Sequence, residues 1–550
     1  MPNRFSEVLS VSKSIGGAST GRKFLSGVSI LTLSALAVKV IGLFYKIPLL
    51  SYLGTEGMGY FNTAYELYAL FCLVCTAGLP TALAVMVAGD GGKYGETKIY
   101  KTAKIIFLAL GIVGSLVMYV FSSGLAAMLD NRGAALCLKA ISPTVLFICL
   151  GSAYRGYFQG KGNMTPTGIS QVVEAACKLI LGLLLGGYAV SRGMTPAVSA
   201  AYAILGLTAG TLLSAVYLRI SYAMYGKKHR ITEGGGSKDG GKIIRELAAI
   251  ALPITLSSLV MGGAKFVDLV VIMSRLTHSG YSESAANSLY GCYSTLVLPI
   301  FNVLPSLTSS VSLSAIPSIA EAISRGEDGE VELRETSRTS FGLVCAVAIP
   351  ASLGLCVFSG DILSLLFSSQ PTAVADATPW LSVMAAAVLP SCIITLTAGM
   401  LQAVGRARVA LLTMLCGVAL KITLGIVLIG KENIGIIGAP LSSVACDILV
   451  ASLNIFALSL KSRALLPSGR ALVGLVLRPT FASAVAIGAS LWARNKFNIE
   501  RSSVSTAVCI LSVMLVYGAV MLIFSLNKHR RTDKYGDQKS EPRGKIDLSS

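Results

Sequence analysis

Apolar runs of roughly 20 residues, separated by short polar stretches, recur from residue 24 to residue 526. A helix needs about 20 apolar residues to cross the hydrocarbon layer of a bilayer, which is about 30 Å thick. By this criterion the pattern predicts about fourteen transmembrane helices. The predicted fold class is therefore an all-α, polytopic membrane protein.

One segment of this pattern occurs twice. Residues 158–185 read FQGKGNMTPTGISQVVEAACKLILGLLL, and residues 401–428 read LQAVGRARVALLTMLCGVALKITLGIVL. Four polar or glycine positions match at one constant offset: Gln159 with Gln402, Gly162 with Gly405, Lys178 with Lys421, and Gly182 with Gly425. Such a repeat between apolar helices is typical of a transporter built from two similar bundles that close on a central site.

The repeat predicts two pseudo-symmetric six-helix lobes followed by two additional helices. Polar segments rich in glycine, serine or charge are expected to separate these parts. The expected boundaries are a cytoplasmic N-terminal tail over 1–23, helices 1–6 over 24–225, a cytoplasmic linker over 226–246, helices 7–12 over 247–461, helices 13 and 14 over 471–526, and a cytoplasmic tail over 527–550.

Composition supports a membrane protein. The 550 residues are 53% hydrophobic and 13% charged, with a mean hydropathy of +0.71, so they carry too few charges to cover a soluble protein of this size. The net charge of +19 comes from Lys and Arg that gather in alternate loops, among them Lys93, Lys98, Lys101, Lys227, Lys228, Arg230, Lys461, Arg463 and Arg470. By the positive-inside rule, this asymmetry predicts a cytoplasmic-membrane protein with both termini in the cytoplasm and no nucleic-acid partner.

Cysteine and histidine do not form a metal motif in this sequence. Nearly all of the 12 cysteines lie in apolar runs, where cysteine behaves as a small hydrophobe, and none of the three histidines stands near a cysteine pair. We therefore expect no metal and no cofactor. Transport would be coupled to Na⁺ or H⁺, or driven by the membrane potential.

Basic side chains inside the apolar runs are candidates for binding a substrate. A lone lysine near the bilayer centre costs about 2.5 to 3.5 kcal/mol, so it should face a polar interior. The alternative for Lys39 is a buried structural ion pair, and the alternative for Lys46 is snorkelling to the outer interface. The cavity candidates are Lys39, Lys46, Arg155, Lys178, Lys265, Arg275 and Lys421.

Acidic side chains in the same runs are candidates for binding a coupling ion, which needs oxygen ligands or a titratable group. They are Glu66, Glu174, Asp268 and Asp447. Gln171, Glu174 and Lys178 share one helix face, and an intrahelical pair of Glu174 with Lys178 is the alternative to a role in transport. Lys265 and Asp268, one turn apart, could compensate each other in the same way.

Three further predictions concern local structure. Prolines are expected to bend the second span at AGLP (77–80) and to interrupt the eighth span at Pro299, Pro305 and Pro317. Arg155 is expected to face the cytoplasmic surface. An aromatic belt at the outer membrane boundary is expected from Tyr60, Phe61, Tyr65 and Tyr68.

Two stretches carry a family resemblance. SALAVKVIGLFYKIPLLSYLGTEGMGYFNTAYELYALFCLVCTAGLPTALAVMVA and YRGYFQGKGNMTPTGISQVVE resemble the stage V sporulation protein B group of polysaccharide biosynthesis proteins. That group is related to the lipid II flippases of the multidrug/oligosaccharidyl-lipid/polysaccharide exporter superfamily. The resemblance implies alternating access by two six-helix lobes, and transfer of an undecaprenyl-linked saccharide from the inner to the outer leaflet.

The same resemblance bears on individual residues. In lipid II flippases a basic central cavity receives the pyrophosphate, and Lys39 in KVIG falls on one of its helix 1 positions. Lys46 stands next to another such position, which is Tyr45 in this chain. The cavity arginine that some of these flippases carry in helix 8 has no counterpart, because residues 288–324 contain no Lys or Arg. This departure leaves open whether lipid II itself is the cargo.

The predicted function is a flippase for a lipid II-like or other lipid-linked saccharide, with the bilayer and the cell-wall synthesis machinery as partners. A role in sporulation is implied only by the resemblance. The alternatives are a cation-coupled multidrug exporter of the same fold, a flippase for another lipid-linked polysaccharide, a membrane enzyme acting on the same precursors, and a scaffold without transport. An enzyme is not expected, because no paired carboxylates or nucleophile constellation stands in a loop.

Overall fold

The computed structural model describes residues 18–89, 94–228, 240–496 and 503–537. Within these ranges the chain forms helices and no strand, which confirms the all-α class. The predicted N-terminal tail, the linker and the C-terminal tail lie largely outside the described residues. The boundaries predicted for the two lobes stay a prediction.

The chain forms two compact units, Met1–Pro299 with Ile422–Ala439, and Ile300–Lys421 with Pro440–Ser550. The first unit contains α2 (Ala18–Leu73), α3 (Leu79–Gly89), α4 (Glu96–Val120), α5 (Ser122–Met128), α6 (Ala135–Gly160), α7 (Thr165–Ser191), α8 (Pro196–Lys228), α9 (Gly240–Gly262), α10 (Ala264–His278) and α11 (Glu283–Cys292). From the start of the second unit onward the helices are α12 (Leu298–Ser324), α13 (Glu330–Val357), α14 (Ser359–Leu366), α15 (Pro371–Ala385), α16 (Val388–Ala403), α17 (Ala407–Ile429), α18 (Gly438–Ser459), α19 (Gly469–Lys496) and α20 (Ser503–Asp537).

The number of membrane spans agrees with the prediction of about fourteen. Twelve helices of the described residues are long and apolar enough to cross a membrane, and a pair bent by 47°, α15 with α16, makes a thirteenth. The stretch Leu33–Gly89 counts once although its 57 residues would extend about 85 Å as a straight helix. Gly54, with φ 66° and ψ −178°, breaks α2 within that stretch. Two spans, as the sequence predicts, therefore fit this stretch better than one.

Proline acts on helix shape differently at different positions. The expected bend at AGLP takes the form of a π-helical turn, η1 (Val74–Gly78), directly before α3. A second π-helical turn, η3 (Tyr293–Val297), precedes Pro299. The prediction that Pro305 and Pro317 interrupt the span is wrong, because α12 continues through both. Near Pro305, the hydroxyl of Ser306 donates to the carbonyl of Asn302 at 2.7 Å, and such hydroxyl bonds help a helix to tolerate proline.

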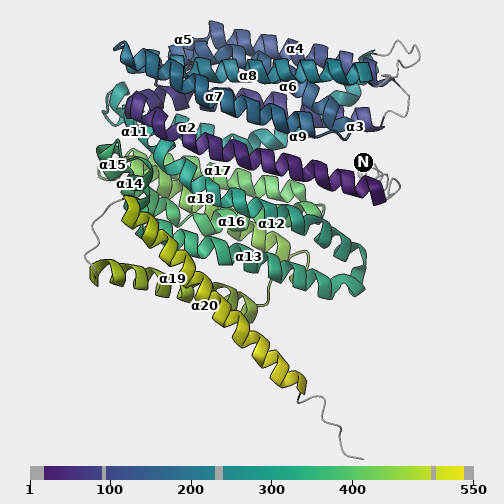
Figure 1. Cartoon of the computed structure of the whole chain (residues 1–550), viewed down its shortest axis with the longest axis vertical. Coiled ribbons are helices and arrows are strands. Elements are labelled where there is room, and N and C mark those ends of the chain that lie inside the picture. Colours follow the sequence, from purple (N-terminus) through teal and green to yellow (C-terminus); the bar gives the residue numbers. More distant parts are fainter. Residues whose placement is uncertain (1–17, 90–93, 229–239, 497–502, 538–550) are drawn as a thin grey trace, which may run out of the picture. The chain divides into compact units, whose positions relative to one another are not determined.

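In the first unit, α7 and α8 run side by side (Figure 1). Gly182 begins the motif GLLLG on α7, and Gly206 begins GLTAG on α8. A Cβ at Gly206 would collide with the backbone of Gly182, so only glycine permits this approach. Small residues spaced by four let membrane helices pack closely, and this packing fixes the wall from which Glu174 and Lys178 project.

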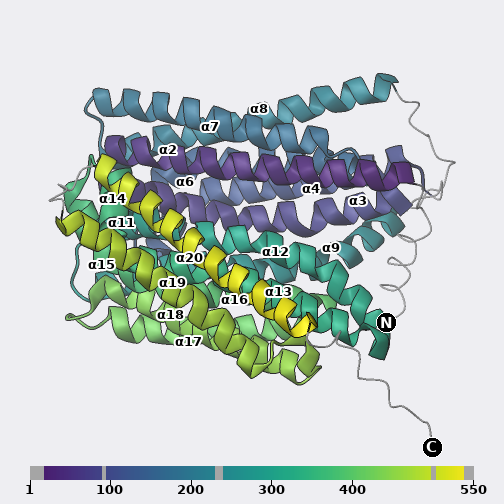
Figure 2. The same ribbon diagram turned by 60° about the horizontal axis from the view of Figure 1, so that its bottom comes forward.

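In the second unit, the added helices α19 and α20 lie against each other and against α13 and α14 (Figure 2). Arg494 of α19 forms an ion pair with Asp361 of α14 at 2.9 Å. The hydroxyl of Tyr517 on α20 donates to the carbonyl of Ala346 on α13 at 2.7 Å. The added pair is therefore tied into its unit by polar contacts as well as apolar packing.

Candidate functional site

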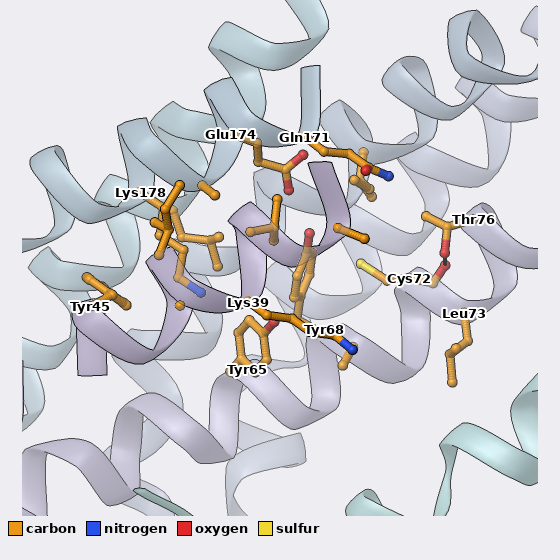
Figure 3. Close-up of a pocket in the computed structure, with 18 of the residues that line it drawn as sticks. Lys39, Tyr45, Tyr65, Tyr68, Cys72, Leu73, Thr76, Gln171, Glu174 and Lys178 are labelled. Atoms are coloured by element: carbon orange, nitrogen blue, oxygen red, sulfur yellow. Dashed lines mark hydrogen bonds between the residues drawn. The ribbon is translucent and has the colours of Figure 1, made fainter. Parts of the chain in front are cut away.

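A cavity of about 570 Å³ lies inside the first unit, between α2, α6, α7 and α8 (Figure 3). Both arms of α2 line it, one around Lys39 and the other from Tyr65 to Leu73, together with Thr76 of η1. Gln171, Glu174 and Lys178 line the opposite wall, as the helix face predicted from their spacing requires. This size is within the usual range of binding pockets, about 300 to 1,000 Å³.

Arg155 and Glu174 form the most strongly connected pair in this cavity. Nη2 of Arg155 lies 2.9 Å from Oε2 of Glu174, and the two side chains are 11% and 20% exposed. Arg155 also donates to the hydroxyls of Ser170 at 3.0 Å and Ser214 at 3.1 Å. The prediction that Arg155 faces the cytoplasmic surface is wrong, because acceptors on α7 and α8 draw the guanidinium inward. Glu174 therefore pairs across helices with Arg155, and the intrahelical pair with Lys178 does not form.

Lys178 instead lies against aromatic rings. Its Nζ is 4.7 Å from the ring centre of Tyr65 and 5.1 Å from that of Tyr45, which are cation–π distances. Figure 3 shows the ammonium group of Lys178 pointing into the cavity on one side of Tyr65, with Lys39 on the other. The Nζ atom of Lys178 therefore lies at the cavity lining and faces the two rings.

The predicted aromatic belt is wrong. Tyr60, Phe61 and Tyr68 are at most 8% exposed, and Tyr65 and Tyr68 line the cavity. Their side chains turn inward because α2 packs against α7 and α11 along this segment. Residue type alone predicted the boundary position, but the rings of Tyr65 and Tyr68 belong to one wall of the site.

Lys39 has no partner for its charge. It lines the cavity, and among the described residues its ammonium group makes no hydrogen bond, ion pair or ring contact. The alternative of a structural ion pair for Lys39 is therefore not formed. The hydroxyl of Tyr45, another residue of the lining, is buried beside Gly182 and has no hydrogen-bond partner among the described residues. The ammonium group of Lys39 is thus free to bind a guest.

The other predicted cations of the first unit lie outside this lining. Nζ of Lys46 donates to the carbonyl of Ser294 in the π-helical turn η3 at 3.3 Å. Lys46 and Lys265 both lie within electrostatic range of Glu66, and so does Asp268, which is 8% exposed. Nε of Arg275 is buried without a hydrogen-bond partner, and its guanidinium lies beside Gly430 at the end of α17.

Lys421 and Asp447 belong to the second unit. The cavity of the first unit contains neither of them. The predicted roles in transport stay predictions for these residues as for Lys39, Lys46, Arg155, Lys178, Lys265, Arg275, Glu66, Glu174 and Asp268.

The cavity favours an anionic guest. Its charged lining consists of Lys39, Arg155, Lys178 and Glu174, and the acid is already bound by Arg155. Two ammonium groups remain to bind an anion through charge-assisted hydrogen bonds. Sequence reasoning found all four charged residues, and the family resemblance pointed to the position of Tyr45. It missed Tyr65 and Tyr68, because an aromatic residue carries the same sequence signal in a belt and in a cavity wall.

The fold and this site define a class, a multi-pass membrane protein with a charged cavity inside a helical bundle. A model of the family described as "Polysaccharide biosynthesis protein" matches residues 24–323, and a model of the family MatE matches residues 293–427. The first match spans more than half of the 550 residues. The chain therefore belongs to the polysaccharide biosynthesis protein family, and the resemblance seen in the sequence is confirmed.

Individual relatives agree with this assignment. Stage V sporulation protein B of Bacillus subtilis (strain 168) is 28% identical over 78% of this chain and 82% of its own length. Lipid II flippase MurJ of the same organism is 24% identical over 74% of this chain and 77% of its own length. A structure described as lipid II flippase MurJ in an inward closed conformation has a TM-score of 0.69 and 16% identity, covering 90% of this chain and 99% of that one. The structural likeness shows that the fold is shared.

Proposed function

We propose that this protein is a flippase that moves an undecaprenyl-pyrophosphate-linked saccharide across the cytoplasmic membrane, and that it is not an enzyme. The observation that carries the proposal is the charge of the cavity in the first unit. Lys39 and Lys178 line it, and the acid of the lining, Glu174, is already paired with Arg155. A pyrophosphate is an anion that two ammonium groups bind well. The relatives named as a lipid II flippase and a sporulation protein support this class of cargo.

The cargo would move by alternating access, from a cytoplasmic to an outer opening, with both termini in the cytoplasm. Lys39 would bind the pyrophosphate directly, because its charge has no other partner. Lys178 would approach it from the tyrosine rings, and Arg155 would keep Glu174 from repelling it. Glu66, Asp268 and Asp447 remain candidates for coupling transport to Na⁺ or H⁺. The alternative energy source for transport is the membrane potential. The cell-wall synthesis machinery would supply and consume the cargo.

A multidrug exporter of the same fold is the second candidate. The MatE match over residues 293–427 favours it, and a cationic drug would require a free acid in the cavity. Glu174 is the acid of the cavity lining, and it is occupied by Arg155. Unchanged drug sensitivity after deletion of the gene, together with accumulation of a lipid-linked precursor, would remove this candidate.

Complementation tests the proposed function. In a strain whose own lipid II flippase is switched off, the wild-type protein should restore growth and Lys39→Ala should not. Losing a charged hydrogen bond worth about 1.5 to 3 kcal/mol lowers binding tenfold or more. Lys39→Arg keeps the charge and should retain part of the rescue, and membrane levels of all variants are measured by immunoblot. Equal rescue by wild type and Lys39→Ala would contradict the role of Lys39.

Failure of the wild type despite normal membrane insertion would point to another lipid-linked glycan. In that case purified protein in liposomes is supplied with other prenyl-pyrophosphate saccharides. Transport of none of them would contradict the flippase proposal.

A binding measurement isolates Lys178. Lys178→Gln should lower the affinity of the purified protein for a short-chain prenyl pyrophosphate about tenfold, because one cation is removed from the cavity. Tyr65→Phe keeps the ring face and should leave the affinity nearly unchanged. A larger effect of Tyr65→Phe than of Lys178→Gln would show that the phenol, and not the ammonium group, binds the cargo.

A further inference from the structure

A second cavity lies within the second unit, far in sequence from the residues of the first. It has a volume of about 180 Å³ and is bounded by α13, α19 and α20. Three arginines line it: Arg338 of α13, and Arg470 and Arg478 of α19. The proposed transport function does not use any of these residues.

The spacing of the lining residues along each helix places them on the face that borders this cavity. Arg470, Gly474 and Arg478 stand four residues apart and so share one face of α19. Arg338 and Gly342 share a face of α13 in the same way, and α13 packs against α19. Two helices therefore present guanidinium groups around a floor that contains two glycines.

The glycines keep this floor open. A Cβ at Gly474 would meet no atom within 4 Å, so the space beside it is unfilled. A Cβ at Gly342 would lie 3.2 Å from the side chain of Leu475. A side chain at position 474 would therefore begin in open space and extend into the cavity.

The arginines of this cavity are unpaired. Among the described residues Arg338, Arg470 and Arg478 make no hydrogen bond or ion pair, and no acid lines the cavity. Some other arginines of the same unit are paired: Arg325 with Glu321 and Glu332, and Arg494 with Asp361. Arg470 and Ala471 lie in the first turn of α19, whose free N–H groups add positive potential.

Arg478 is the most informative of the three. It lies about 12 Å along the helix from Arg470, inside a helix apolar enough to span a membrane. A charge in such a position is costly and marks a functional site by default. An anion beside it would offset that cost, and this chain supplies none among the described residues.

The surroundings favour a lipid over a free anion. The rest of the lining is apolar and consists of Ala346, Ala471, Leu475, Pro479 and Met521. The neighbouring surface of α19 exposes Leu472, Val473 and Leu477 by 43%, 56% and 60%. Arg470 is also one of the basic residues that the positive-inside rule predicts on the cytoplasmic side. Basic pockets between membrane helices on the cytoplasmic side bind the head groups of anionic lipids.

We propose that Arg338, Arg470 and Arg478 bind the phosphate head group of an anionic membrane lipid. The acyl chains would lie along the exposed apolar face of α19, and the phosphate would accept hydrogen bonds from guanidinium groups of both α13 and α19. Such a lipid would hold the C-terminal helix pair to α13. Inorganic phosphate has the same binding chemistry, so the experiment must separate the two sources.

Lipid binding to the purified full-length protein tests this site. Mixed micelles carrying phosphatidylglycerol or phosphatidylcholine are titrated, and bound lipid is counted by native mass spectrometry. The wild type should prefer phosphatidylglycerol. A variant with Arg338→Gln, Arg470→Gln and Arg478→Gln together should weaken this binding at least tenfold. Arg325→Gln, which removes an exposed and paired arginine, is the matched control and should change it less than twofold.

The variant Gly474→Leu distinguishes binding of lipid in the cavity from non-specific attraction of anionic lipid to the arginines. It keeps all three arginines but fills the cavity, and it should also weaken binding at least tenfold. If the triple variant does not fold, Gly474→Leu still tests the proposal. Unchanged phosphatidylglycerol binding by Gly474→Leu would overturn the proposal, and so would equal binding of phosphatidylcholine. Binding of inorganic phosphate without binding of phosphatidylglycerol would overturn the lipid assignment.

Discussion

Replacing Arg155 with alanine should lower the free energy of unfolding by about 3 kcal/mol, the low end of the range for breaking a buried ion pair. The change leaves the Glu174 carboxylate, 20% exposed, without its cation. The hydroxyls of Ser170 and Ser214 lose less, because each also donates to a backbone carbonyl, that of Thr167 and that of Ser170. The expected loss therefore arises mainly from one uncompensated charge.

Thermal or denaturant unfolding of the detergent-solubilised protein measures this loss. A double variant, Arg155→Leu with Glu174→Leu, should recover much of it, since apolar replacement of a whole buried pair is often neutral. The control is Arg325→Ala, which breaks the exposed pairs with Glu321 and Glu332, whose side chains are 61% and 43% exposed, and it should cost less than about 1 kcal/mol. A double variant less stable than Arg155→Ala would contradict this account of the pair.

Gly291→Val should destabilise the first unit by at least about 3 kcal/mol, from overpacking together with lost hydrogen bonds. A Cβ at Gly291 would collide with the carbonyl of Thr55 and the backbone of Gly59, so α11 could no longer approach α2. This approach also supports buried hydrogen bonds. Asn287 donates to the carbonyl of Glu56 at 2.8 Å, and Asn62 donates to the hydroxyls of Ser294 and Thr295 at 2.9 and 2.8 Å.

The measurement is the thermal midpoint, together with the fraction of protein that elutes as one species in size-exclusion chromatography. Gly124→Val is the matched control, because a Cβ at Gly124 meets no atom within 4 Å. If valine abolishes folding, Gly291→Ala supplies a smaller change of the same sign. Equal midpoints for the variants at Gly291 and Gly124 would show that the close approach of α2 and α11 is not required.

The sequence predicted those features that depend on one helix at a time. Apolar runs predicted the spans, because the length of hydrocarbon that each must cross is fixed. Spacing placed Gln171, Glu174 and Lys178 on one face, and the structure has all three lining one cavity. The cost of burying a charge in lipid singled out Lys39 without any knowledge of its neighbours.

Features that depend on two or more helices could not be predicted in this way. The partner of Glu174 is Arg155, on another helix, although Lys178 stands one helical turn away. The tyrosines of α2 follow the same sequence pattern whether they face head groups or a cavity. The arginines of α13 and α19 meet only in the folded second unit, because residues 338 and 470 are far apart in the chain.

The sequence by itself determined that this is a helical membrane protein with a repeated segment and a charge on helix 1 that requires a polar surrounding. The reason is that hydrophobic length and the cost of a buried charge are properties of each segment. Tertiary structure decided which charges are neutralised and which stay free, since an ion pair forms only where two side chains meet within about 4 Å. For this reason Arg155 is paired, whereas Lys39 meets no acid among the residues that the structure describes.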